Sequence, residues 1–199
     1  WERVKSTIQA GEIDRVDHIS SNIGFAFTYD PNNRLINKAL GGGVTLDLMV
    51  YPLSLVGELV GDMIGCSVEA DIVETNVDAK MAVAMSFRNG VTANICASTY
   101  SNACNSFCVF GTNGSVKIEN MFEPHKLIVT INKESGKIEE TFRHAGDLFE
   151  FQIKEVINCI AGKEGESRII SHKATKRTMS MIDEILALAI SATGASGKE

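Results

Sequence analysis

Apolar and polar residues alternate one by one through the middle of the chain. Met81, Val83, Met85 and Phe87 are separated by small or polar residues, a period of two that is typical of a strand with one buried face. The same pattern predicts strands over residues 16–27, 68–75, 80–87, 91–100, 107–110, 116–118, 127–131 and 138–142. Hairpin signals join consecutive strands at Asn89-Gly90, Asn113-Gly114 and Glu134-Ser135-Gly136. We therefore expect one large, mostly antiparallel sheet.

Apolar residues at helical spacing predict two helices toward the C-terminus. Asp147-Leu148-Phe149-Glu150 resembles a capping box and starts the first of them. Its apolar stripe consists of Phe149, Ile153, Val156, Ile157 and Ile160. The second helix is predicted from about residue 173 to 192, and residues 191–199 should fray. The predicted fold is therefore α+β: a large, mostly antiparallel, open-faced sheet with helices on one face, as a single domain over residues 1–199.

The other face of the sheet has no predicted helix to cover it. Apolar positions on both faces of the strands indicate burial by something outside the chain, so we expect a homo-oligomer that pairs through this sheet face. The alternative is a monomer whose outer face is merely mixed, and the polar Thr92, Asn94 and Ser98 keep that alternative open.

A glycine-rich turn precedes another apolar run of helical spacing. Gly41, Gly42 and Gly43 free the backbone to bend sharply and let another segment or a ligand approach closely. The apolar positions of the predicted helix are Leu46, Met49, Val50 and Leu53. The turn lacks the motifs of a phosphate cradle, because neither Gly-x-Gly-x-x-Gly after a strand nor Gly-Lys-Ser/Thr occurs here.

Asp47 and Tyr51 stand four residues apart in this run, so an α-helix would stack them on one face. A carboxylate accepts a hydrogen bond and a phenol donates one or relays a proton, and together they could hold a hydroxylated substrate. On spacing alone the structural alternative is the more frequent one: an aspartate near a helix start and a tyrosine with its ring in the core. Pro52 predicts a kink that falls mostly after the pair.

The segment from Arg34-Leu35 through the three glycines to Asp47 and Tyr51-Pro52-Leu53 closely resembles a signature of the glucose–fructose oxidoreductase / inositol dehydrogenase (Gfo/Idh/MocA) family. In that family the segment opens the long helix of the second domain. Residues 1–16 resemble the lead into the first strand of that domain, with Asp14 in place of a glycine, and residues 149–190 resemble its closing helices. A tyrosine rather than a histidine at position 51 resembles the dihydrodiol dehydrogenase-like or glucose–fructose oxidoreductase branch rather than the inositol dehydrogenases.

The resemblance implies the C-terminal domain of an NAD(P)-dependent oxidoreductase that acts on a sugar, polyol or cyclic diol by hydride transfer. It implies catalytic roles for Asp47 and Tyr51, and it places Arg34 near the site entrance, where the arginine would bind substrate. Phe25 and Phe27 precede the signature and could line the pocket, although packing within a strand explains them at least as well. Since a free tyrosine phenol has a pKa of about 10 and is a poor base, the main proton transfer is expected from a lysine in an N-terminal Rossmann domain. That domain, which would bind NAD or NADP, is missing from these residues.

We therefore expect this chain to be a fragment that binds no cofactor and is inactive alone. Its start at Trp1 rather than a methionine fits that expectation. The alternative is a non-catalytic binding or assembly module of the same fold.

Composition further narrows the class of protein and the kinds of partner that we expect. An apolar fraction of 44% with 22% charged residues is ordinary for a globular protein. The formal charge of −6 argues against nucleic acid or an anionic membrane as a partner. We expect no membrane association, because we expect that no apolar run of the sequence is as long as a membrane-spanning helix. The five cysteines and four histidines show no metal-ligand spacing, so we expect no metal, reduced thiols and a cytoplasmic location.

Overall fold

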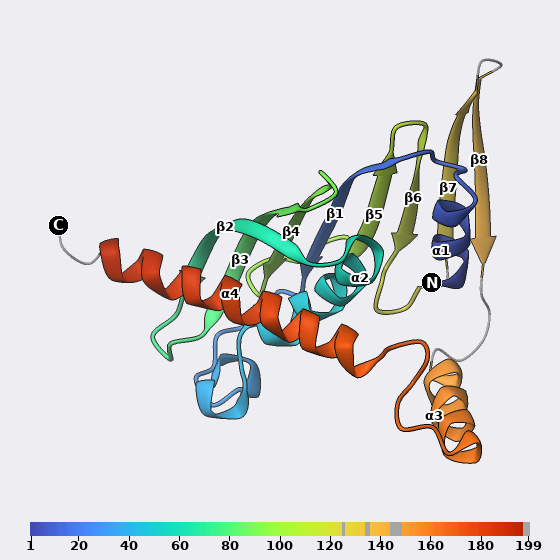
Figure 1. Ribbon diagram of the computed structural model, residues 1–199. Coiled ribbons are helices and arrows are strands. Elements are labelled where there is room, and N and C mark those ends of the chain that lie inside the picture. The colour runs from blue at the N-terminus through green and yellow to red at the C-terminus, as the bar shows by residue number, and fades with distance from the viewer. Residues whose placement is uncertain (125, 134–135, 144–148, 197–199) are drawn as a thin grey trace.

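One sheet of eight strands runs through the molecule in the order β2-β3-β4-β1-β5-β6-β7-β8 (Figure 1). This computed structural model describes residues 1–124, 126–133, 136–143 and 149–196. The strands are β1 Val16–Gly24, β2 Met63–Ile72, β3 Asp78–Phe87, β4 Thr92–Ser98, β5 Ser106–Gly111, β6 Gly114–Glu119, β7 Lys126–Lys133 and β8 Gly136–Arg143. All neighbours pair antiparallel except β1 and β4, which are parallel. The predicted α+β class and mostly antiparallel sheet are confirmed.

Some strand ends differ from the prediction. β2 begins at Met63, five residues before the predicted start at residue 68. β1 ends at Gly24 rather than at residue 27, although the Phe25 and Phe27 amides still donate to Ser98 and Thr99 carbonyls at 3.2 Å. The alternation of residue types continues past Gly24, so the sequence predicted a strand that extends to residue 27. The third hairpin turn and the capping box involve residues 134–135 and 147, which lie outside the described residues.

The helices are α1 Glu2–Gln9, α2 Val50–Val60, α3 Glu150–Gly162 and α4 His172–Ser196. Short 3₁₀ turns, η1 Arg34–Ile36 and η2 Lys38–Leu40, precede a π-helical turn, η3 Thr45–Met49. The expectation that the chain frays from Ser191 is wrong up to Ser196, because α4 continues to that residue. Ala189 is fully buried, which anchors the helix one turn before the polar end.

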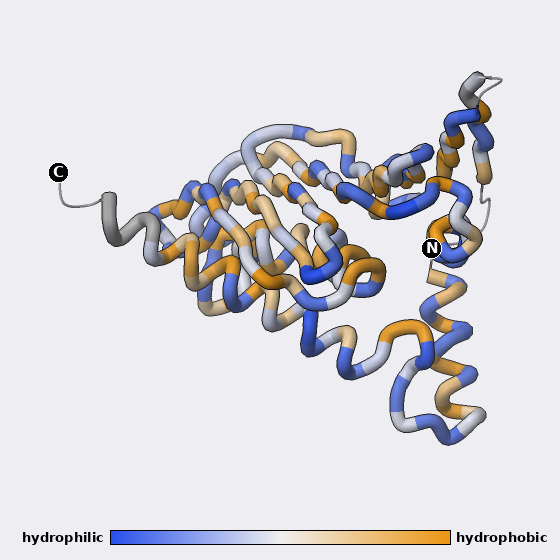
Figure 2. Tube along the Cα trace, turned by 45° about the horizontal axis from the view of Figure 1, so that its top comes forward, coloured by the Kyte–Doolittle hydropathy of each residue, from blue (hydrophilic) through white to orange (hydrophobic). Residues whose placement is uncertain are grey.

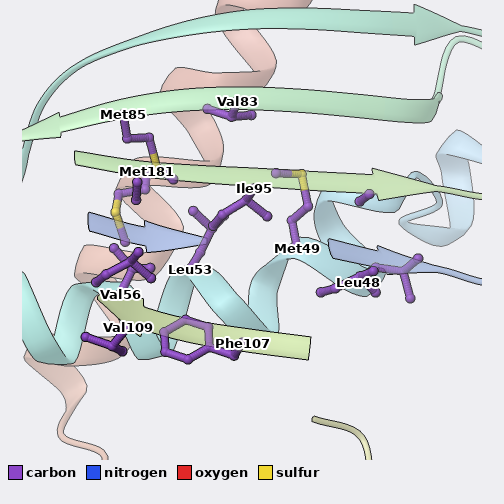
Figure 3. Packing of buried hydrophobic residues seen from close by; sticks show 14 of the residues in the cluster. Leu48, Met49, Leu53, Val56, Val83, Met85, Ile95, Phe107, Val109 and Met181 are labelled. Atoms are coloured by element: carbon purple, nitrogen blue, oxygen red, sulfur yellow. The ribbon is translucent and has the colours of Figure 1, made fainter. Parts of the chain in front are cut away.

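The hydrophobic core lies between one face of the sheet and the segment from η3 to α2. Met49, Leu53 and Val56 are fully buried and point toward the sheet residues Ile95 and Val109 (Figure 3). Each such side chain contributes about 1.5–3 kcal/mol by leaving water. The apolar spacing of this segment therefore sets how deeply it sits, and it leaves Asp47 and Tyr51 at the rim of the core.

On the central strands of the sheet, the outer face carries small and polar side chains. Ser20, Asn94 and Ala84 lie side by side across β1, β4 and β3, and none of them is buried. On these central strands the register directs the Ile, Val and Met positions to the core, so apolar residues occupy both faces only elsewhere, as at Phe110 of β5, which is 41% exposed on the outer face. Pairing through this face stays a prediction.

Helix α3 covers less of the sheet than expected. Its apolar stripe matches the predicted helix, yet none of its residues is buried and the helix stands away from the sheet in both views (Figures 1 and 2). Ile153, Val156, Ile157 and Ile160 are each more than half exposed. The prediction that both closing helices cover the sheet therefore holds for α4 and is wrong for α3.

The segment Lys38–Val60 is long and apolar enough to pass a composition test for a membrane span, with a mean hydropathy of 1.5. The expectation that no run reaches such a length is therefore wrong. Half of its most apolar window is buried inside the structure, as in a core helix, and the segment comprises η2, the glycine turn, η3 and α2.

Candidate functional site

The glycine turn folds back tightly on η1. The Gly42 amide donates to the Asn37 carbonyl at 3.0 Å, and the Gly43 amide donates to the Leu35 carbonyl at 2.8 Å. A Cβ at Gly42 would lie 2.7 Å from the Arg34 carbonyl oxygen, so only glycine fits there. Gly43 has a φ of +111°, and a Cβ on it would lie 2.1 Å from Asp78 Oδ1. Gly41, with a φ of +72°, ends η2. The turn thus places η1 beside the start of the signature helix.

Asp78 is a buried carboxylate at the base of this turn, and the sequence reasoning missed it. Only 3% of the residue is exposed. Its Oδ2 accepts hydrogen bonds from the Thr45 amide at 2.7 Å and from Thr45 Oγ1 at 2.6 Å. Burial raises the pKa of the Asp78 carboxyl, while the bonds from Thr45 act in the opposite direction. No local spacing could have revealed the pair, because 33 residues separate its members.

The helix that carries Asp47 and Tyr51 does not start as an α-helix. Asp47 lies in the π-helical turn η3, and Tyr51 lies in the first turn of α2. The prediction of an α-helix at Asp47 is therefore wrong, and the stacking of the two side chains on one face stays a prediction. Pro52 is the third residue of α2, which continues directly from η3, so its missing amide proton falls close to the change from π to α geometry, and the predicted kink stays a prediction. Such π turns are frequent at functional sites.

Arg34 reaches Asp47 directly. Arg34 Nη2 lies 2.7 Å from Asp47 Oδ1, with 56% of the arginine side chain and 27% of the aspartate side chain exposed. The pair forms because the glycine turn returns the chain from η1 to η3. The structure thus brings together two of the predicted site residues at the surface, where a ligand oxygen can reach both groups.

Tyr51, four residues after Asp47, joins an aromatic cluster. Its ring meets Phe122 edge-on, with centroids 5.0 Å apart, and Phe122 meets Phe25 at 5.3 Å. Half of Tyr51 is exposed, so the tyrosine is not a core residue. Phe25 follows β1 and Phe122 comes from the loop between β6 and β7. Sequence reasoning chose Phe25 and missed Phe122, which has no periodic pattern around it.

A hollow of about 510 Å³ opens at this cluster and is lined by Phe25, Ala103, Cys104, Asn105, Asn120, Phe122 and Glu123. Its size suits a small molecule. A larger hollow of about 620 Å³ lies between α3 and α4 and is lined by Glu164, Gly165, Glu166, Ser167, Arg168, Ser171 and His172. None of the signature residues borders either hollow. We place the candidate site at the first one because Phe122, which lines it, contacts the Tyr51 ring.

The glycine turn does not fit a dinucleotide phosphate. The amides of Gly42, Gly43 and Thr45 already donate within the chain, and the Asp78 carboxylate occupies the start of the helix where a phosphate would sit. Among the described residues there is also no cluster of three metal-ligating side chains, and all five cysteines are free. The site is thus built from a carboxylate, a guanidinium, a phenol and an aromatic wall.

Comparison with known proteins gives one family match. The family model described as "GFO/IDH/MocA C-terminal domain" matches residues 1–117. No curated protein sequence matches the chain.

Three solved structures share the fold. Aldose-aldose oxidoreductase from Caulobacter crescentus, complexed with glycerol, is 22% identical with a TM-score of 0.78, and the match covers 94% of this chain and 57% of that one. A 3-ketoreductase from Actinomadura kijaniata, in complex with NADP and TDP-benzene, is 19% identical with a TM-score of 0.76, covering 92% and 57%. Levoglucosan dehydrogenase, in complex with NADH and levoglucosan, is 18% identical with a TM-score of 0.78, covering 94% and 60%. The chain thus spans 57% to 60% of these solved chains.

Proposed function

The chain belongs to the GFO/IDH/MocA family as a C-terminal domain, and we propose that it is the substrate-binding domain of an NAD(P)-dependent oxidoreductase acting on a sugar, polyol or cyclic diol. The observation that carries this proposal is that the segment after the glycine turn presents the Arg34–Asp47 pair at the surface and, four residues after Asp47, Tyr51 against Phe122, which lines the hollow. Structural neighbours with glycerol or levoglucosan bound support the substrate class.

In this proposal the polar groups hold the substrate by its hydroxyl groups. The Tyr51 hydroxyl donates to, or accepts from, the hydroxyl at the reacting carbon. Asp47 accepts from a neighbouring hydroxyl through the carboxylate oxygen that Arg34 does not hold. Arg34, which contacts Asp47 at 2.7 Å, keeps that carboxylate in one orientation and offers its other donors to a substrate oxygen.

The aromatic residues supply the apolar wall. Phe25 is 44% exposed and lies with Phe122 along the hollow. A sugar or cyclic diol has an apolar C–H face as well as a hydroxyl edge. That face can pack on the rings while the edge turns toward Asp47 and Tyr51, so the wall selects a ring over a linear polyol.

The nicotinamide cofactor supplies the redox chemistry in such an enzyme, and the described residues form no phosphate site for it. We therefore propose that residues outside this chain, in an N-terminal Rossmann domain, bind NAD or NADP. The exposed apolar stripe of α3 supports a contact with a further part of a longer protein. Residues 1–199 alone are then inactive as a dehydrogenase.

Two further proposals concern the cellular location and the oligomeric state of the protein. Free cysteines support a cytoplasmic location. A homo-oligomer through the outer sheet face would place Asn94 near the centre of the contact. Light scattering should then show an oligomer that Asn94→Lys converts to monomer, and monomer for the unmodified protein at high concentration would refute the pairing.

A substrate panel tests the proposed function. The full-length protein is assayed with sugars, polyols and dihydrodiols, each with NAD and with NADP, by the absorbance of the reduced nicotinamide. We expect turnover of a ring-shaped substrate that falls in Tyr51→Phe, whereas the surface variant Asp71→Asn retains full activity. Binding of a panel member without turnover on either cofactor would favour the alternative, a non-catalytic binding or assembly module.

A further inference from the structure

We propose that Asp78 is a positioning residue for the candidate site: by holding Thr45 it sets the turn from which Asp47 meets Arg34. The proposal rests on the proposed function of that site. Asp78 itself is buried beneath the turn and does not line the hollow. Its effect on substrate must therefore pass through the residues that it holds.

The first step is the anchor. Asp78 is the first residue of β3, an interior strand that pairs with β2 and β4 on its two sides. The next two core-facing residues of that strand, Ala79 and Met81, are almost fully buried. The carboxylate projects from the first residue of the strand, next to a shift in the register with β2. The following Ala79 carbonyl accepts from the Thr99 amide at 2.9 Å and from the Thr99 hydroxyl at 3.0 Å, which holds this end of the strand.

The second step is the contact between the anchor and the helix. One oxygen of Asp78 accepts from both the amide and the hydroxyl of Thr45, at 2.7 and 2.6 Å. Thr45 is fully buried and is the first residue of η3, two residues before Asp47. The first amides of a helix have no partner within it, so this bond decides where the helix starts. The Asp47 amide then donates to the Gly43 carbonyl at 3.1 Å.

The third step is the fit between the turn and the carboxylate. Gly43 has a φ of +111°, and its missing Cβ leaves room for Asp78 Oδ1, which a Cβ would approach to 2.1 Å. The negative charge also faces the positive end of the helix dipole. The turn and the carboxylate thus fit one another, and together they fix η3 relative to η1, which carries Arg34.

Local hydrogen exchange separates positioning from plain stability. In Asp78→Asn and in Thr45→Val, we expect the Asp47 amide to exchange about tenfold to a hundredfold faster, while the Val109 amide in the middle of β5 is unchanged. Thr45→Ser keeps the hydroxyl, and Asp71→Asn removes an exposed carboxylate that accepts from Tyr100 at 2.8 Å. Both controls should exchange like wild type. An equal change at Asp47 and Val109, or no change at Asp47, overturns the proposal.

A crystal structure and kinetics complete the test. In Asp78→Asn, Arg34 Nη2 should no longer lie within hydrogen-bond distance of Asp47 Oδ1, and an intact pair overturns the proposal. In the full-length protein, kcat/KM should fall about tenfold or more in Asp78→Asn and Thr45→Val, with Thr45→Ser near wild type. If the full-length protein turns over no substrate, the proposed function fails, while exchange and the crystal structure still decide the role of Asp78. Should Asp78→Asn not fold, Thr45→Val carries the same measurements.

Discussion

Removing the charge of Asp47 separates its part in substrate binding from its part in stability. Asp47→Asn keeps the shape of the side chain and leaves Arg34 facing a neutral amide. The ion pair that is lost lies at the surface, with the arginine side chain 56% exposed. Such pairs contribute about 0.2–1 kcal/mol to the free energy of unfolding. For a protein of this size, the loss lowers Tm by at most about 4 °C.

The expected effect on catalysis is larger. A hydrogen bond from a substrate hydroxyl to a charged group contributes about 1.5–3 kcal/mol, so kcat/KM should fall about tenfold to a hundredfold in the full-length protein. Tyr51→Phe is the matched variant, because the ring keeps its edge contact with Phe122 while only the hydroxyl is lost. It should lower kcat/KM by a similar factor with almost no change in Tm.

Calorimetric melting and steady-state kinetics on the same preparations measure the change in Tm and the change in kcat/KM. The expected pattern is a nearly unchanged Tm with a clearly reduced kcat/KM. The reverse pattern, a Tm lowered by far more than 4 °C with kcat/KM near wild type, would show that the carboxylate is structural. Full activity in the folded Tyr51→Phe, Asp47→Asn double variant would refute the catalytic role of the pair.

Three further predictions follow from the turn and its carboxylate. Calorimetric titration of residues 1–199 with NADPH should show no appreciable binding, and micromolar affinity would contradict the absence of a phosphate site. Gly43→Ala should lower Tm more than Gly41→Ala, because both positions have positive φ but only Gly43 lacks room for a Cβ; equal losses would contradict this. Burial raises the folded-state pKa of Asp78, so its contribution to stability is full below the unfolded pKa of about 3.9 and is lost as the pH rises through the folded pKa. The Tm of wild type relative to Asp78→Asn should therefore decrease as the pH rises above about 4, and a constant or growing difference would contradict that sign.

The sheet could be predicted from the sequence because its signals are local. Period-two alternation from Met81 to Phe87 and the Asn-Gly turns depend only on neighbours along the chain, and each appears as a strand or a hairpin. The parallel pairing of β1 with β4 depends on the path of the chain in space, which no local pattern contains.

The site was only partly predictable for the same reason. The glycines and the apolar spacing located the segment that carries Asp47 and Tyr51. The contact that holds the start of η3, between Thr45 and Asp78, joins residues that are remote in sequence. Phe122 likewise contacts Tyr51 from a loop that lies 71 residues later in the sequence (122 − 51).

A structure of the full-length protein with the best substrate of the panel tests the central claim most directly. The account predicts a substrate ring packed on Phe122, with one hydroxyl within hydrogen-bond distance of Tyr51 Oη and another within reach of Asp47. A substrate bound elsewhere, such as in the hollow between α3 and α4, with Tyr51 and Asp47 untouched, would contradict it.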